Sequence, residues 1–128
     1  MAIRFFPSAH SRKGGVVWRF EPSPRLFMIL IYITCKNREE AKKIALALIK
    51  ERLVACCNIF PIESISWWRG KIVKSREAVL IAKTLKKNFK KVEKEVKRLH
   101  GYTTPCILEI PISQASQDFF NWLEKEIK

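Results

Sequence analysis

The order of apolar patterns between Met28 and Lys128 restricts the fold more than any other feature of this chain, because a strand, a helix and a strand occur twice in succession. The predicted strands are 28–35, 53–68 with an interruption at Pro61, 71–84 and 106–112, and the predicted helices are 37–52, 85–100 and 116–127. Two split βαβ units within about a hundred residues are typical of a ferredoxin-like fold. We therefore predict an α+β domain at 28–128 with the order βαββαβ, an antiparallel sheet covered by helices on one face, and an extra C-terminal helix.

Capping residues and apolar spacing define the helices. Asn37 can cap the first helix, and Glu40 stands three residues later, as at the start of many helices. In the second helix, apolar residues step by four and three positions from Leu85 to Leu99, and Gly101 follows where a glycine ends many helices. Both helices are therefore predicted to be amphipathic.

The two middle strands form a hairpin that is longer than usual. Arg69 and Gly70 provide the turn, and strands of ordinary domains are about five or six residues long. Arms of this length project past the core and need cover from elsewhere, which predicts pairing with neighbouring subunits. The sheet face without helices is predicted to carry a half-apolar set of residues suited to an oligomer interface, namely Tyr32, Thr34, Val79, Ile81, Lys83 and Glu109.

Residues 1–27 differ from the domain. They lack periodicity, contain three prolines and two glycines, and show no apolar core of a signal peptide. We predict a disordered N-terminal extension outside the domain. A start codon assigned too far upstream is the plainer explanation, and a transit peptide is the alternative.

Charge and cysteine content narrow the class of protein. The net charge is +13, of which residues 1–27 carry +4, from five basic residues and one acid, so that +9 remains in the domain. Many of the domain's lysines lie on the second helix beside glutamates, a pattern typical of a solvated helix face. No apolar stretch approaches the roughly 18 residues of a membrane span, so no membrane partner is expected. Four cysteines without a secretory signal predict a reducing compartment, and we place the protein in the cytoplasm.

Several separated motifs resemble one family. They are Glu51-Arg52-Leu53-Val54-Ala55-Cys56, Pro61-Ile62, Trp68-Arg69-Gly70-Lys71-Ile72, Ala82-Lys83-Thr84 and Leu99-His100-Gly101-Tyr102-Thr103-Thr104-Pro105. Their order and spacing resemble the CutA divalent-cation tolerance proteins over 28–128. The resemblance implies a ferredoxin-like homotrimer whose long hairpins pair between subunits. It also implies a role in tolerance to copper and other divalent cations, with no established catalytic reaction.

The chain departs from the family pattern at the positions that concern metal. The family's usual His-Pro-Tyr is here His100-Gly101-Tyr102, and Cys106 replaces a common glutamate. The first-strand cysteine that is implicated in copper binding in some members falls on Ile33. Only His100 therefore matches directly.

Cys35, Cys106 and His100 are the predicted metal ligands. The first and fourth strands of this fold are antiparallel neighbours, so the end of one, Cys35, should lie near the start of the other, Cys106. Two thiols and an imidazole suit copper, zinc or another soft cation. The alternative is that both cysteines are core residues, Cys35 in phase with Ile33 and Cys106 with Leu108.

A second predicted site is a small-ligand cleft. The resemblance places several members of this set around a cleft between trimer subunits: Trp68, Lys71, Lys83, Tyr102, Glu109 and Trp122. Aromatic rings and lysines there can hold a small anion or another small ligand. The alternative is an ion pair between Lys83 and Glu109, with the aromatic residues packing an interface.

Catalysis and nucleic-acid binding are the other function classes. The only histidines are His10 and His100, and no nucleophile with an adjacent base is visible, so enzyme activity is not expected. Basic ferredoxin-like domains include RNA-binding modules that stack bases on aromatic residues of their central strands. The third strand here has no aromatic residue. The stacking surface of those modules is therefore missing from this strand. An RNA- or anion-binding module is kept as the alternative to a metal-binding protein because of the fold and the positive charge.

Overall fold

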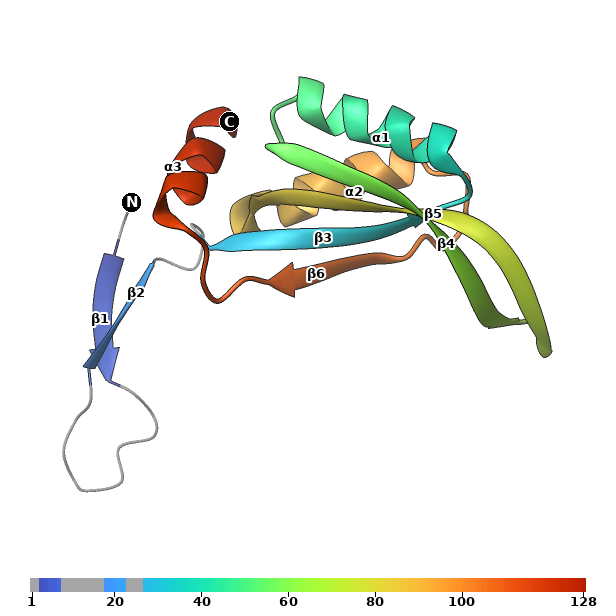
Figure 1. The fold of residues 1–128 in the computed structure, drawn as a ribbon, viewed down its shortest axis with the longest axis horizontal. Helices are drawn as coiled ribbons and strands as arrows, with labels where there is room; N and C mark the ends of the chain where they lie inside the picture. Colours follow the sequence, from blue (N-terminus) through green and yellow to red (C-terminus); the bar gives the residue numbers. More distant parts are fainter. Residues whose placement is uncertain (1–2, 8–17, 23–26) are drawn as a thin grey trace.

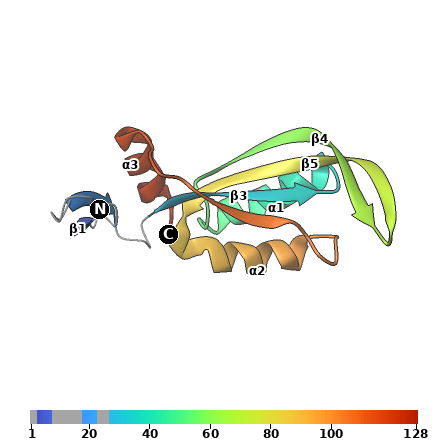
Figure 2. The same cartoon turned by 90° about the horizontal axis from the view of Figure 1, so that it is seen from below.

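The computed structural model describes residues 3–7, 18–22 and 27–128, and its main sheet has the strand order β4-β5-β3-β6. The strands are β3 (Met28–Cys35), β4 (Cys56–Trp68), β5 (Lys71–Leu85) and β6 (Ile107–Pro111), and the helices are α1 (Arg38–Lys50), α2 (Phe89–Leu99) and α3 (Gln117–Glu126). All neighbouring strands are antiparallel. α1 and α2 cover one face of the sheet, and α3 lies at the end away from the hairpin (Figures 1 and 2). The predicted ferredoxin-like α+β fold is confirmed.

The core lies between this sheet and the two covering helices. Alternate residues of β3 face the helices, and Ile31 and Ile33 are fully buried there. Ile44 and Leu48 of α1 and Val96 of α2 pack into the same cluster. A second, smaller cluster joins α3 to the ends of β3 and β5. One amphipathic face of each helix therefore accounts for its position, as the apolar spacing predicts.

α2 begins later than its periodicity predicts, because Leu85 still belongs to β5 and Lys86–Asn88 form a short 3-10 helix, η2. Two buried side chains fix this junction through one backbone oxygen. The Thr84 hydroxyl donates to the Leu53 carbonyl at 2.6 Å, and the Asn88 amide donates to the same oxygen at 3.0 Å. These bonds tie the start of α2 to the connection between α1 and β4.

The side chains of β6 alternate in the opposite phase from the one predicted. Ile31 pairs with Glu109 and Ile33 with Ile107, so Glu109 lies on the helix face of the sheet. Leu108 therefore lies on the open face, with 52% of its surface exposed. The prediction of Glu109 on the open face and Leu108 in the core is wrong, because register with β3 sets the phase and both phases of β6 contain apolar residues.

The hairpin of β4 and β5 is one continuous ladder from Cys56 opposite Lys83 to Trp68 opposite Lys71. The expected interruption at Pro61 does not occur. β4 is an edge strand, and a proline there can turn its missing N–H side outward without losing a ladder bond. Arg69 and Gly70 both have positive φ, 51° and 75°, as a two-residue hairpin turn of this type requires. The hairpin extends well beyond the helices (Figure 1).

Two further strands occur in the segment for which the sequence predicts disorder. β1 (Ile3–Pro7) and β2 (Trp18–Pro22) pair antiparallel in a sheet of their own. Phe27 also belongs to that segment, and its carbonyl accepts the Lys86 N–H at 2.8 Å. The rest of the prediction falls on residues outside the described ranges, and the domain boundary at Met28 stays a prediction. No helix in the described part of the chain combines the length and apolar content that a bilayer span requires.

Candidate metal centre

Three potential ligands meet where β3 ends, α1 begins and α2 ends. They are Cys35, Glu40 and His100, whose ligand atoms all lie within 4.8 Å of one another. Cys35 is the last residue of β3 and is fully buried. Glu40 lies in the first turn of α1, and His100 is the C-terminal capping residue of α2 with a fully buried side chain. The sheet and both covering helices therefore position this cluster.

The ends of the helices explain why these residues converge. The Asn37 side chain accepts the backbone N–H of Glu40 at 2.9 Å, which starts α1 as the sequence predicts. A carboxylate at this position of a capped helix points back toward the preceding strand. It therefore reaches the end of β3, where its Oε1 accepts the Lys36 N–H at 3.0 Å.

Glu40 also binds the loop that follows α2. Its Oε2 accepts the backbone N–H of Gly101 at 3.0 Å. A proline at position 101, which the family pattern has, carries no N–H and cannot make this bond. A Cβ added to Gly101 would itself stand 3.0 Å from the same oxygen. Glycine at position 101 therefore supplies the N–H that Glu40 accepts and leaves room for its carboxylate.

The hydrogen bonds of His100 define its protonation state. Nδ1 accepts the backbone N–H of Tyr102 at 3.0 Å, and Nε2 lies 2.7 Å from the carbonyl oxygen of Thr34. A carbonyl only accepts, so the ring is neutral with its proton on Nε2. The same Nε2 is 3.7 Å from Oε1 of Glu40. Both ring nitrogens are therefore engaged in hydrogen bonds.

The thiol of Cys35 is protonated in this environment. Burial, followed by the negative charges of Glu40 and Glu77, raises its pKa to about 12. Sulfur, carboxylate and imidazole together suit zinc or copper, and a carboxylate keeps lone pairs free while it accepts two hydrogen bonds. The donor set fits a borderline or soft cation. Binding through Cys35 requires loss of the thiol proton. Binding through His100 requires one ring nitrogen to leave its partner, which is the Tyr102 N–H at Nδ1 or the Thr34 carbonyl at Nε2.

Cys106 does not join this cluster. Its backbone oxygen accepts the Thr34 N–H at 3.3 Å, so the chain passes close to β3. It stands opposite Thr34, however, and the phase of β6 places its side chain toward the open face, whereas Cys35 points to the helix side. The prediction of Cys106 as a partner of Cys35 is wrong for this reason. Glu40 takes its place, although the sequence indicated it only as a helix-capping residue.

The six predicted cleft residues lie in separate parts of the subunit. Trp68 and Lys71 face each other at the tip of the hairpin, and Tyr102 lies beside His100, with ring centroids 4.9 Å apart. Lys83 lies near α3, with its ammonium 5.4 Å from the centre of the Phe119 ring. The remaining contacts are Trp122 against Phe119 and Glu109 against Lys86, the latter at 2.7 Å. The alternative ion pair of Lys83 with Glu109 is wrong, because the two residues lie on opposite faces, whereas the cleft between subunits stays a prediction.

Tyr102 connects the metal cluster to the base of the hairpin. Its hydroxyl donates to Oε2 of Glu77 at 2.7 Å. Burial and this bond raise the pKa of the Tyr102 hydroxyl, so it stays protonated and remains the donor. The loop at 100–102 is therefore fixed to the rest of the fold at three points: His100 to Thr34, Gly101 to Glu40, and Tyr102 to Glu77.

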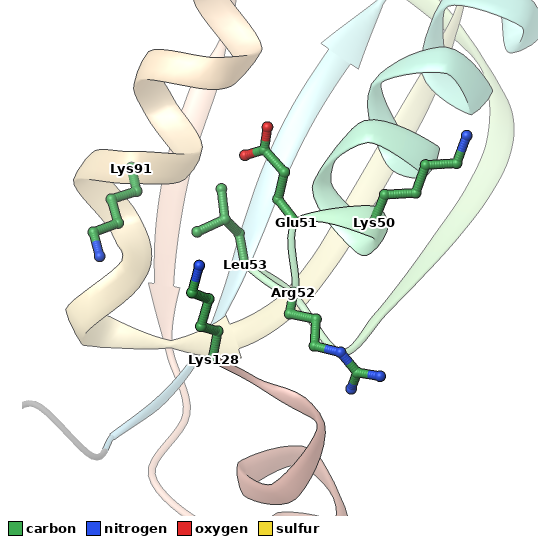
Figure 3. A pocket seen from close by; sticks show the side chains of 6 residues that line it. All are labelled: Lys50, Glu51, Arg52, Leu53, Lys91 and Lys128. Atoms are coloured by element: carbon green, nitrogen blue, oxygen red, sulfur yellow. The ribbon is translucent and has the colours of Figure 1, made fainter.

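A basic depression lies away from this cluster. It has a volume of about 440 Å³ and is lined by Lys50, Glu51, Arg52, Leu53, Lys91 and Lys128. Figure 3 shows the side chains of Lys50 and Arg52 pointing away from the space between the two helices, while Glu51 points into it. Arg52 is also paired with Glu126 at 3.0 Å. The cations do not converge, so this depression gives no support to an anion-binding module.

Thiol reactivity follows from burial and pKa. The pKa of Cys57 is also raised to about 12, by burial and by Cys56. Compared with an ordinary pKa of 9.0, this lowers the thiolate fraction near neutral pH by roughly a thousandfold. We expect iodoacetamide to modify Cys56 and Cys106, which are partly exposed, long before Cys35 and Cys57, as followed by mass spectrometry of the peptides. Early labelling of Cys35 would contradict this assignment.

The same pKa values predict a pH dependence of stability. The folded state holds the Cys35 and Cys57 protons more tightly than the unfolded chain. The corresponding stabilisation is complete below about pH 9 and is lost as the pH rises toward 12. We expect the midpoint of urea unfolding to fall over this range, and replacement of Cys57 by alanine to reduce the slope.

Known proteins match this chain over its main domain. Residues 29–126 match the family model of the CutA1 divalent ion tolerance protein. The divalent-cation tolerance protein CutA of Archaeoglobus fulgidus is 46% identical over 98 residues, which are 77% of this chain and 96% of that protein. The crystal structure of CutA1 from Oryza sativa has a TM-score of 0.79 and 34% identity, and the match covers 83% of this chain and 98% of that one.

The names of these relatives contradict the predicted cytoplasmic location. The solved Archaeoglobus fulgidus structure, with a TM-score of 0.78 and 44% identity over 79% of this chain and 99% of that one, is described as a periplasmic protein. The relatives from Oryza sativa and Arabidopsis thaliana are named chloroplastic. The prediction fails because free cysteines do not identify a reducing compartment: an unpaired thiol packs as a small apolar side chain in any compartment.

The family assignment rests on the domain as a whole. The family match begins one residue after the start of β3 and ends at the last residue of α3. The relative and structures quoted above agree with this chain in sequence, in fold and over nearly their whole length. The chain therefore belongs to the CutA1 family of divalent-ion tolerance proteins.

Proposed function

We propose that this chain acts in divalent-cation tolerance by binding copper or a similar cation at Cys35, Glu40 and His100, without catalysing a reaction. The observation that carries the proposal is the approach of a thiol, a carboxylate and an imidazole to within 4.8 Å of one another. These three donor types match the preference of copper and zinc. A sensing role fits the same site, because a cation that takes a ring nitrogen of His100 must break one of its two hydrogen bonds, to Tyr102 or to Thr34.

Titration of the purified protein with zinc and with copper(I) tests this site. Replacing Cys35 with serine is expected to weaken binding more than about tenfold, since even the loss of an outer hydrogen-bond partner of a metal ligand costs that much. Cys106→Ser is the matched control, because Cys106 lies outside the cluster, and it should bind as the parent does. Equal affinities for all three proteins, or a loss only in Cys106→Ser, would exclude the site.

Proton release gives an independent readout of the same proposal. The thiol of Cys35 is protonated below about pH 12, so a cation that binds it displaces a proton. Affinity should rise about tenfold for each unit of pH near neutrality, and Cys35→Ser should flatten this dependence. A cation whose affinity does not change with pH is not bound by this thiol.

We further propose that the working unit is a homotrimer assembled through the open sheet face and the hairpin. The open face exposes Leu108 and Ile110 on the edge strand β6 and Phe60 on the opposite edge strand β4, and no helix of the described chain covers it. Exposed apolar residues on an uncovered sheet face are typical of an interface between subunits.

Sedimentation of a charge variant tests the assembly. Leu108→Lys is expected to shift the mass from trimer to monomer, because it buries an unpaired charge in the contact. Ile72→Lys is the control, since Ile72 lies on the hairpin face that continues the helix side of the sheet. A monomeric parent protein, or a trimeric Leu108→Lys, would refute this interface.

A further inference from the structure

The projecting part of the hairpin has two faces, and only one of them continues the open sheet face. Directly opposed residues of antiparallel strands point to the same side. Trp67 pairs with Ile72 and Ile65 with Lys74, and all four lie in phase with Leu80, which faces the helices. We call this surface the outer face of the hairpin; it consists of Glu63, Ile65, Trp67, Ile72, Lys74 and Arg76. Figure 2 shows that the hairpin reaches far past the ends of α1 and α2.

The outer face carries the three most exposed large apolar residues of the described chain. Trp67, Ile65 and Ile72 are 74%, 71% and 62% exposed, the three highest values among the large apolar residues that the structure describes. The proposed trimer contact uses the opposite face, which carries Trp68 and Val73. The outer face therefore needs a partner of another kind.

Charge on the hairpin identifies the chemistry of that partner. From Ser64 to Arg76 there is no acidic residue, whereas there are four basic ones, Arg69, Lys71, Lys74 and Arg76. None of the four forms an ion pair within the described residues. Of these four, Lys74 and Arg76 stand on the outer face beside the apolar patch, with Glu63 as the only acid there, whereas Lys71 lies on the opposite face.

We propose that the outer face of the hairpin docks on an anionic lipid surface. Tryptophan with aliphatic neighbours inserts at the boundary between head groups and acyl chains, and lysine and arginine beside it bind lipid phosphates. The prediction of no membrane partner rests on the lack of a spanning segment, and a surface contact needs none. This inference does not depend on the proposed metal site.

Two other partners fit the outer face less well. A second copy docked by its own outer face would bring two positively charged patches together, which opposes association. A single-stranded nucleic acid would stack bases on Trp67, but the two isoleucines beside it offer no surface for stacking. The aliphatic side chains therefore favour lipid.

Co-sedimentation with vesicles tests the proposal on the full chain. The vesicles are made of phosphatidylcholine, with about one third phosphatidylglycerol in the anionic set. Lys74→Gln is expected to weaken binding about fivefold, and Ile72→Ser about tenfold. The matched controls on the opposite face, Lys71→Gln and Val73→Ser, should bind as the parent does. Residues 1–27 are identical in all variants, so their charge does not affect the comparison.

The result expected overall is binding that requires anionic lipid, weakens with salt and depends on the outer face alone. The proposal would be overturned if the parent protein did not bind vesicles or bound pure phosphatidylcholine equally well. It would also be overturned if the variants of both hairpin faces lost the same vesicle affinity. A changed oligomeric mass of Ile72→Ser would show that the outer face contacts another subunit instead. If the outer-face variants lose affinity for an RNA oligonucleotide but keep their affinity for vesicles, the outer face binds nucleic acid instead.

Discussion

Replacing Glu40 with alanine is expected to lower the free energy of unfolding by about 3 kcal/mol, because one carboxylate holds two segments that are 61 residues apart in sequence. Its oxygens accept the N–H groups of Lys36 and Gly101, both at 3.0 Å, and its side chain is 6% exposed. Hydrogen bonds to a charged acceptor contribute about 1.5 to 3 kcal/mol each, and water can replace part of that at the exposed Gly101. The measurement is urea unfolding of the metal-free protein, since a bound cation would add its own stabilisation.

Glu39 provides the control for this substitution. It occupies the same turn of α1 and carries the same charge, but it is exposed and makes no hydrogen bond across the fold among the described residues. Glu39→Ala should cost less than about 1 kcal/mol, the usual size of a favourable charge near a helix N-terminus. If both variants lose the same stability, then the charge at the start of α1 matters and the contact with the loop at 100–102 does not.

The elements of this fold were predictable because their signals are local. Asn37 caps α1 and its side chain accepts the N–H of Glu40, as the sequence around the cap indicates. The turn at Arg69 and Gly70 has the positive φ angles that close a two-residue hairpin. Each of these features depends on residues within one turn of the chain, so composition and spacing were sufficient.

The phase of β6 could not be predicted in the same way. Cys106, Leu108 and Ile110 form one apolar set, and Ile107 belongs to the other, so the alternation of polarity does not choose between the faces. The choice comes from pairing with β3, a contact between strands about 75 residues apart. The errors at Cys106 and Glu109 share this cause.

The candidate site was predicted in part. Cys35 and His100 do meet, because β3 and α2 both end at the same end of the sheet. Glu40 was missed, since its role as a cap residue explained its presence without a further function. The available signal was Gly101 in place of the family's usual proline, because a glycine has the N–H that Glu40 accepts and a proline does not.

Replacing Leu48 with alanine is expected to cost about 3 kcal/mol of the free energy of unfolding. Leu48 is fully buried in the cluster between α1 and the sheet, and its carbonyl also accepts the N–H of Leu53 at the end of the helix. Truncation removes the buried side chain and leaves a cavity that the β-sheet beneath cannot fill. Leu46→Ala is the matched control on the same helix, because Leu46 is 56% exposed and alanine favours the helix as strongly as leucine does. It should change stability by less than about 0.5 kcal/mol. Equal losses at both positions would mean that α1 does not bury the face described above, and the placement of Glu40 on that helix would fall with it.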